Sequence, residues 1–358
     1  MQGFVSRNRA HVFLLLAGGA AACSSNPSQP TVTDPGGPTI SCPAPPAPVR
    51  AADGSGAIVN FGAPIVALGS TPLTGPTCNP SSGSRFAPGI TGVTCTVTDS
   101  KARSASCAFP VVVQLPLKLA LTRFIAFGDS MTAGEVVSEG FGPKGLRPLQ
   151  VDKAVSYPTD LQRLLDVRYP GQVPGAFVEN DGLSGETTPQ GRVRLPTVLS
   201  QANQPQVLLL LEGVNDLGGG TSAVTQAVLN LDAMVASAKN RGLRVVVGTL
   251  PPQNPIAPTG TGESCVARNG GYAFVTPFNN AVKIMAASES IPVADVYQAF
   301  NGDVTTLIDC DGLHPTALGY QAIAQSFFEV ITKNFEQAST TTTAIRAFAP
   351  LIAPPRRR

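Results

Sequence analysis

From Leu119 onward the chain alternates between short apolar runs and longer stretches with helical periodicity, and this alternation restricts the fold most. Continuous apolar runs are typical of strands that are buried on both faces. Strands are expected at residues 123–127, 176–179, 207–211, 244–250 and 292–296. Helices are expected at residues 157–168, 190–202, 222–240, 273–288 and 315–333. The alternation predicts a parallel five-stranded sheet between helices, a three-layer α/β/α fold of the flavodoxin type.

In such a sheet the ligand site lies at the carboxyl ends of the strands, and polar segments follow three of these ends. Ser130, in Gly-Asp-Ser, follows the first expected strand where the chain turns into helix, which exposes its hydroxyl near the helix dipole. Gly185 lies in a loop after the second strand, where a backbone N–H can donate to an oxyanion. Asn215 follows the third strand, and its amide can donate another hydrogen bond. Each segment alone is also ordinary turn composition.

His314 is the only histidine beyond the N-terminal leader, and Asp311 precedes it by three residues. A serine hydroxyl holds its proton too tightly to attack near neutral pH unless a neutral imidazole accepts that proton. Asp311 can hold the imidazole in the required tautomer and stabilise its protonated form. A lone histidine is more often structural, but its pairing with Asp311 and the three other segments favours a general base.

Taken in this order, the four segments resemble those of the SGNH hydrolase superfamily, also called GDSL esterases and lipases. The resemblance covers about residues 119–335, and Met131 stands where the family name has leucine. It implies that Ser130 is the nucleophile, with His314 as general base and Asp311 as its orienting partner. It also implies an oxyanion hole made of the Ser130 and Gly185 N–H groups and the Asn215 side chain. No metal ion or organic cofactor is expected, and residues 135–156 are expected to border the substrate cleft.

Residues 42–115 have a different pattern, in which short β-rich runs are broken by Pro and Gly. Runs at residues 57–61, 93–98 and 107–113 indicate a small β-sandwich. Segments within residues 80–109 resemble the hyalin repeat (HYR) module, which is an immunoglobulin-like domain, and the resemblance covers most of residues 40–115. The resemblance implies a spacer or adhesive unit rather than a catalytic one.

The first 22 residues have the pattern of an export signal, in which basic residues precede a short apolar run and then small residues. The apolar run is too short to span a bilayer. The small residues before Cys23 resemble the bacterial lipobox, which implies a lipid on Cys23 as a membrane anchor; ordinary cleavage with secretion is the alternative. We therefore expect an exported cell-envelope lipoprotein or a secreted protein. Residues 23–41 are expected to be a flexible tether, and residues 336–358 a disordered tail.

Lipidation of Cys23 would leave six of the seven cysteines, an even number that suits disulfides in an oxidising compartment. The remaining cysteines are Cys42, Cys78, Cys95, Cys107, Cys265 and Cys310. The long gap after Cys107 predicts that the first four pair among themselves and the last two with each other. A disulfide between the last two would hold the loop at residues 251–271 against the loop that carries Asp311. The connectivity within the first four stays open.

The formal net charge of +2 is misleading, because six arginines lie in the leader and the C-terminal tail. Without them, 19 basic residues face 23 acidic ones, so no nucleic-acid surface is indicated. We expect a serine ester hydrolase that acts on an acylated carbohydrate or lipid through an acyl-serine intermediate. One alternative is an adhesion or carbohydrate-binding surface protein with an inactive SGNH-like domain, and another is an acyltransferase. The sequence leaves open the acyl chain length and the alcohol part of the ester.

Overall fold

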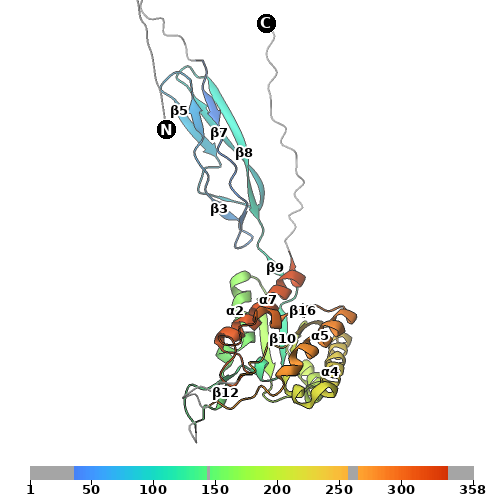
Figure 1. Ribbon diagram of the computed structural model, residues 1–358. Coiled ribbons are helices and arrows are strands. Elements are labelled where there is room, and N and C mark those ends of the chain that lie inside the picture. The colour runs from blue at the N-terminus through green and yellow to red at the C-terminus, as the bar shows by residue number, and fades with distance from the viewer. Residues whose placement is uncertain (1–35, 143–145, 257–264, 338–358) are drawn as a thin grey trace, which may run out of the picture. The chain divides into compact units, whose positions relative to one another are not determined.

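The computed structural model describes residues 36–142, 146–256 and 265–337 (Figure 1). The expected signal peptide, Cys23, most of the tether and all but two residues of the tail lie outside these ranges. Within the described ranges, no helix combines the length and the apolar character that a membrane span requires.

The central sheet has five strands in the order β13-β10-β14-β15-β16, and all neighbours are parallel. Its strands are β10 (Arg123–Gly128), β13 (Phe177–Gly182), β14 (Val207–Leu211), β15 (Arg244–Gly248) and β16 (Val293–Ala294). This order confirms the predicted flavodoxin-type sheet. Gly128 pairs with both Gly182 and Leu211, so three strands end at the same level. The loops that follow them therefore meet at one edge.

Helices cover this sheet as the sequence predicts, and their ends differ from the predicted ones by at most two residues. One group contains α2 (Tyr157–Arg168) and α7 (Ala317–Phe335), which pack against each other. The other contains α3 (Thr188–Gln201), α4 (Gly220–Asn240) and α5 (Tyr272–Ser288), which pack in succession. The sheet lies between the two groups (Figure 1). Every residue of β14 is buried, as its continuous apolar sequence requires.

Short elements connect these layers near the carboxyl edge of the sheet. They are α1 (Ser130–Ala133), β11 (Glu135–Val137), β12 (Leu149–Val151), η2 (Lys153–Val155), η3 (Val214–Gly219) and α6 (Val296–Ala299). The strand expected at residues 292–296 is shorter than predicted, because Asp295 caps α6 by accepting a hydrogen bond from the Gln298 N–H. The apolar residue Val296 thus belongs to a helix.

The described chain divides into two compact units, one with residues 36–43, 63–79 and 94–108 and the other with residues 44–62, 80–93 and everything described from 109 onward. In the first unit, β1 (Thr39–Ser41) pairs with β4 (Ile65–Ala67), and β5 (Thr74–Asn79) pairs with β7 (Gly89–Thr98). In the second, β3 (Ala57–Val59) pairs with β6 (Ser84–Phe86), and β2 (Val49–Arg50) pairs with β8 (Ser104–Gln114). The N-terminal region is therefore β-rich, as expected.

Two short strands lie at the inner ends of the segments expected to be the tether and the tail. The tether was expected to extend to residue 41, but Thr39–Ser41 form β1. The tail was expected to start at residue 336, but β17 (Glu336–Gln337) pairs antiparallel with β9 (Lys118–Leu119). Glu336 also accepts hydrogen bonds from Arg168 and Tyr169 of the α2 region. The change in composition marks where apolar periodicity ends, whereas backbone pairing continues beyond it.

Candidate active site

Ser130, His314 and Asp311 form one continuous chain of hydrogen bonds. The His314 Nε2 atom lies 3.0 Å from the Ser130 Oγ, and the Nδ1 atom lies 2.6 Å from the Asp311 Oδ2. All three residues are buried, with 2% or less of their surface exposed. With Nδ1–H donating to Asp311, the Nε2 lone pair faces the serine hydroxyl and can accept its proton.

The turn from β10 into α1 fixes the position of Ser130. Asp129 caps α1 by accepting a hydrogen bond from the Met131 N–H at 3.0 Å. Its second oxygen accepts from the Gly213 N–H at 3.3 Å, which links this turn to the loop after β14. The sequence motif Gly-Asp-Ser thus contains a capping residue as well as the hydroxyl group.

Asp311 lies in the loop before α7, and its carboxylate is held by backbone N–H groups of the residues that follow it. Its Oδ1 accepts from the Leu313 and His314 N–H groups at 3.0 and 2.9 Å, while Oδ2 faces the imidazole. Burial by itself raises the pKa of Asp311, but these hydrogen bonds and the adjacent His314 lower it below the ordinary value. Asp311 is therefore ionised where an imidazolium would need a negative partner.

Gly185 and Asn215 line the same hollow as Ser130 and His314, a space of about 810 Å³ at the carboxyl edge of the sheet. Gly185 has a φ of 76°, a left-handed conformation that favours glycine, and its N–H belongs to an exposed loop. The Asn215 Nδ2 donates to the Glu186 carbonyl at 2.8 Å. Since an amide nitrogen has two hydrogens, one stays available to a bound molecule.

An ion pair between the part-buried Arg194 and the buried Glu186, which the sequence did not predict, supports this loop. The Arg194 Nε of α3 donates to the Glu186 Oε1 at 2.6 Å, and a second guanidinium nitrogen donates to the carbonyls of Asp181 and Gly128 at 3.0 and 3.4 Å. The guanidinium also lies 4.0 Å from the centre of the Phe127 ring. Arg194 therefore connects the ends of β10 and β13 with the residue that follows Gly185. An arginine in an ordinary helical pattern carries no sequence signal for this role.

Two further carboxyl groups, Asp129 and Glu212, are buried beside this network. Burial raises the pKa of Asp129 to about 7, although three backbone N–H groups and the charge of His314 oppose the shift. Burial, together with the charges of Asp129 and Glu186, raises the pKa of Glu212 to about 9. Neither Glu212 oxygen has a hydrogen-bond partner among the described residues. Glu212 is therefore neutral near pH 7.

Glu135 is a further acidic residue that the sequence analysis did not single out as a site residue. Its Oε2 lies 3.6 Å from the His314 Nε2, and it lines the hollow with Pro148 and Leu149. Residues of the segment 135–156 thus border the hollow, as predicted. The acidic character of Glu135 is visible in the sequence, but its proximity to His314 is not.

Three disulfides join Cys42 to Cys107, Cys78 to Cys95 and Cys265 to Cys310. The first four cysteines therefore pair among themselves and the last two with each other, as the spacing predicts. Cys42, Cys95 and Cys107 have their sulfur atoms close together, but disulfide bonding leaves them no thiolate with which to hold a metal ion. The Cys265–Cys310 bond ties the loop before α5 to the residue next to Asp311.

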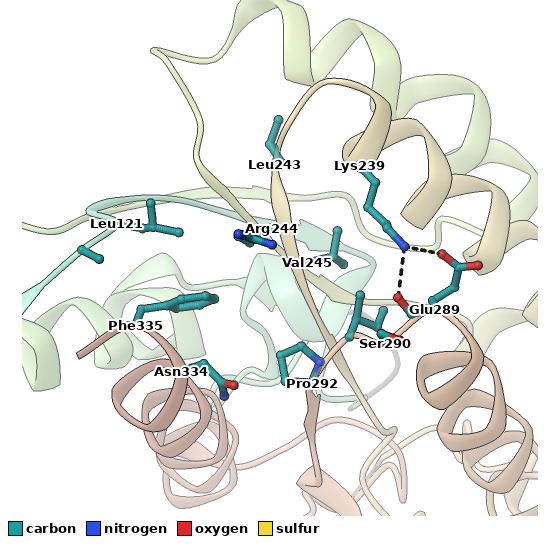
Figure 2. Close-up of a pocket in the computed structure, with 12 residues that line it drawn as sticks. Leu121, Lys239, Leu243, Arg244, Val245, Glu289, Ser290, Pro292, Asn334 and Phe335 are labelled. Carbon is teal, nitrogen blue, oxygen red and sulfur yellow. Dashed lines mark hydrogen bonds and ion pairs between the residues drawn. The ribbon is translucent and has the colours of Figure 1, made fainter. Parts of the chain in front are cut away.

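A separate cavity of about 460 Å³ lies at the amino ends of the strands (Figure 2). Arg244 at the start of β15 and Phe335 at the end of α7 line it, and Lys239 and Glu289 form an ion pair there at 2.7 Å. Ser130 lies at the opposite ends of the same strands, and Figure 2 shows no imidazole among the lining side chains. This cavity therefore lacks the imidazole that faces the Ser130 hydroxyl at the candidate active site.

The family model of the GDSL-like lipase/acylhydrolase family matches residues 126–322, more than half of the chain. The chain belongs to this family. The matched range includes the five residues of the candidate site: Ser130, Gly185, Asn215, Asp311 and His314.

Similar proteins include the esterase TesA of Pseudomonas aeruginosa, with 27% identity over 140 residues. These residues make up 38% of this chain and 61% of TesA, so the chain spans less than two thirds of that relative. The aryl esterase of M. smegmatis has 21% identity and a TM-score of 0.47, covering 59% of this chain and 99% of that one. The carbohydrate acetylesterase Est24 of Sinorhizobium meliloti has 18% identity and a TM-score of 0.46, covering 60% of this chain and all of the other.

Proposed function

We propose that this GDSL-family chain is a serine ester hydrolase that cleaves carboxylic esters through an acyl-serine intermediate. The observation that carries the proposal is the hydrogen-bond chain from the Ser130 hydroxyl through His314 to Asp311, which faces an open hollow. Gly185 and Asn215 supply donors on the same hollow. Nucleophile, base, orienting carboxylate and oxyanion donors are the parts that ester hydrolysis by serine needs.

In the acylation step, the Ser130 Oγ attacks the ester carbonyl carbon while its proton passes to the His314 Nε2. The negative charge that develops on the carbonyl oxygen is stabilised by the Ser130 and Gly185 N–H groups and the Asn215 amide. The carbon–oxygen bond to the alcohol then breaks, and the imidazolium gives its proton to the departing oxygen. Asp311 stabilises the imidazolium throughout.

In the deacylation step, His314 takes a proton from water, whose oxygen attacks the acyl carbon. The bond to the Ser130 Oγ breaks and the serine regains a proton from the imidazolium. The carboxylic acid leaves, and the site returns to its starting state. A sugar hydroxyl in place of water would give acyl transfer by the same steps.

The proposal extends to the location and the domain organisation of the chain. We infer export by the signal at residues 1–22 and anchoring by a lipid on Cys23, with secretion without the lipid as the alternative. Residues 42–115 are inferred to be an HYR-like spacer, and residues 119–335 the hydrolase domain. Three disulfides support an oxidising compartment. An acylated carbohydrate or a lipid is the inferred substrate, and no nucleic-acid partner is inferred.

Hydrolysis of p-nitrophenyl acetate by the chain and its Ser130→Ala and His314→Ala variants tests the proposal. Each variant is expected to lower kcat/KM by at least about 10³-fold, because each removes a part that works only in concert with the others. Ser222→Ala, which changes an exposed serine of α4, should leave the rate unchanged and is the matched control. Circular dichroism of all variants checks that the fold is kept.

Hydrolysis that does not depend on Ser130 would overturn the proposal. If esters from acetyl to long acyl all remain uncleaved, the binding-protein alternative is favoured. Product analysis with an added sugar acceptor separates hydrolysis from transfer, since a transferase would convert the acceptor to its ester.

A further inference from the structure

Glu135 places a second carboxylate at the catalytic imidazole, on the side away from Asp311. Its Oε2 lies 3.6 Å from the His314 Nε2, the same nitrogen that faces the Ser130 Oγ. Only 16% of the Glu135 side chain is exposed. Among the described residues, none donates a hydrogen bond to this carboxylate, so its oxygens are available to a bound molecule.

The backbone of Glu135 is held firmly on both sides. Gly134 ends α1 with a φ of 89°, and a Cβ at this position would lie 2.6 Å from the Ser156 Cβ. Glu135 then pairs with Val151 in the β11–β12 ladder, and its carbonyl accepts a hydrogen bond from the buried Tyr320 hydroxyl at 2.6 Å. The left-handed turn at Gly134 therefore directs Glu135 to a fixed place beside His314.

The position of Glu135 beside the His314 Nε2 corresponds to the alcohol part of a bound ester. The His314 Nε2 must reach the departing alcohol oxygen, because it returns the proton to it. The oxyanion lies instead toward the Gly185 N–H and the Asn215 amide. Since Glu135 is close to Nε2, its carboxylate would lie near the carbon atoms of the alcohol in a bound ester, next to the oxygen that leaves.

We propose that Glu135 is a specificity-determining residue that accepts a hydrogen bond from a hydroxyl on the carbon adjacent to the ester-bearing carbon. The inference rests on the proposed function and narrows its substrate class to esters of polyols, including sugars, with a free neighbouring hydroxyl. An alkyl group at this place would cover the carboxylate without giving it a donor, which is unfavourable for a charged group. A hydroxyl satisfies it.

The test compares 2-hydroxyethyl acetate with 2-methoxyethyl acetate, which differ in one donor on the adjacent carbon. The intact chain is expected to prefer the hydroxyl ester in kcat/KM by roughly ten- to a hundredfold, the range for a hydrogen bond to a charged group. Glu135→Gln, which keeps the side-chain shape, should lose most of this preference, and Glu135→Ala should bring the ratio close to one. Glu139→Gln, which changes an exposed glutamate of the same segment, should keep it.

A ratio near one in the intact chain, or a ratio that the Glu135 variants leave unchanged, overturns the inference. A loss of rate on both esters without a change in their ratio also overturns it, because it assigns Glu135 to stabilising the imidazolium instead. Hydrolysis of p-nitrophenyl acetate that depends on Ser130, with neither glycol ester cleaved, overturns the inference and leaves the proposed function intact. Absence of any hydrolysis that depends on Ser130 overturns both.

Discussion

Glu212 and Asp129 are buried carboxyl groups on the two loops that carry Asn215 and Ser130. The Gly213 N–H donates to Asp129, and Glu212 packs against Gly191 of α3 without a donor of its own among the described residues. Burial raises the pKa of both groups. A carboxyl group that prefers to be neutral in the folded chain destabilises the fold whenever the pH favours its ionised form.

The free energy of unfolding should therefore depend on pH through Glu212. Its pKa is about 9 in the folded chain against 4.5 ordinarily, so between these values the native state holds one proton more than the unfolded chain. The stability contribution is complete below about pH 4.5 and is lost as the pH rises toward 9, by up to about 1.4 kcal/mol per pH unit.

Urea unfolding at several pH values between about 5 and 9 measures this dependence in the intact chain and in Glu212→Gln. The glutamine of the variant cannot ionise. The free energy of unfolding of the variant should therefore fall less steeply with pH than that of the intact chain, and the two slopes should differ by roughly 1 kcal/mol per pH unit. Because Asp129 also titrates in this range and its charge raises the pKa of Glu212, the difference in slope reports Glu212 together with its coupling to Asp129. Equal slopes would show that Glu212 does not hold its proton in the folded chain.

Helix α3 acts on the candidate site through one side chain that reaches across to two strand ends. Arg194 donates to the carbonyls of Gly128 and Asp181 and pairs with Glu186, whose carbonyl in turn accepts from Asn215. The Glu186 side chain is 1% exposed. Packing of α3 on the sheet therefore sets the geometry of the loop that contains Gly185.

Arg194→Met keeps an extended apolar side chain but leaves the Glu186 carboxylate buried without its partner. Breaking a buried pair in this way costs about 3–5 kcal/mol of unfolding free energy, and we also expect kcat to fall about tenfold as the loop that contains Gly185 shifts. Urea unfolding and ester hydrolysis measure the two effects.

The double variant Arg194→Met with Glu186→Gln is the matched control for charge. It removes both charges, so it should recover most of the lost stability, whereas kcat should stay low because the links to Gly128 and Asp181 are missing. If the free energy of unfolding of Arg194→Met lies within about 1 kcal/mol of that of the intact chain, the pair is not needed for stability.

In the molecule as a whole, the residues of the candidate site and the core of the sheet belong to residues 118–337. The hydrogen bonds that link Ser130, His314 and Asp311 stay inside this range. The β9–β17 pair closes it, since it joins Leu119, which belongs to the core, to Glu336. We therefore predict that the proposed hydrolase domain folds without the β-rich N-terminal region.

A chain of residues 117–337 should retain kcat/KM for p-nitrophenyl acetate within about threefold of the full chain, because no site contact is removed. A chain of residues 121–335 lacks β9 and β17 and should unfold at a lower temperature. Hydrolysis assays and thermal unfolding monitored by circular dichroism compare the two. Loss of activity in the longer fragment would show that the N-terminal region contributes to the site.

The sequence by itself determined the order of elements in the hydrolase region and the positions of Ser130, Gly185, Asn215, Asp311 and His314. It could do so because continuous apolar runs mark buried parallel strands, and because the residues that follow such strands meet at one sheet edge. These are local patterns, and local patterns are readable along the chain.

Only the tertiary structure decided the remaining features, because each depends on which distant segments become neighbours. Arg194 and Glu135 look like ordinary charged residues until folding brings them to Gly128 and His314. The pairing of β9 with β17 joins backbone groups more than 200 residues apart, and hydrogen bonds of the backbone leave no trace in side-chain patterns. The Cys42–Cys107 and Cys78–Cys95 pairing likewise depends on which segments folding brings together, and cysteine spacing does not specify this.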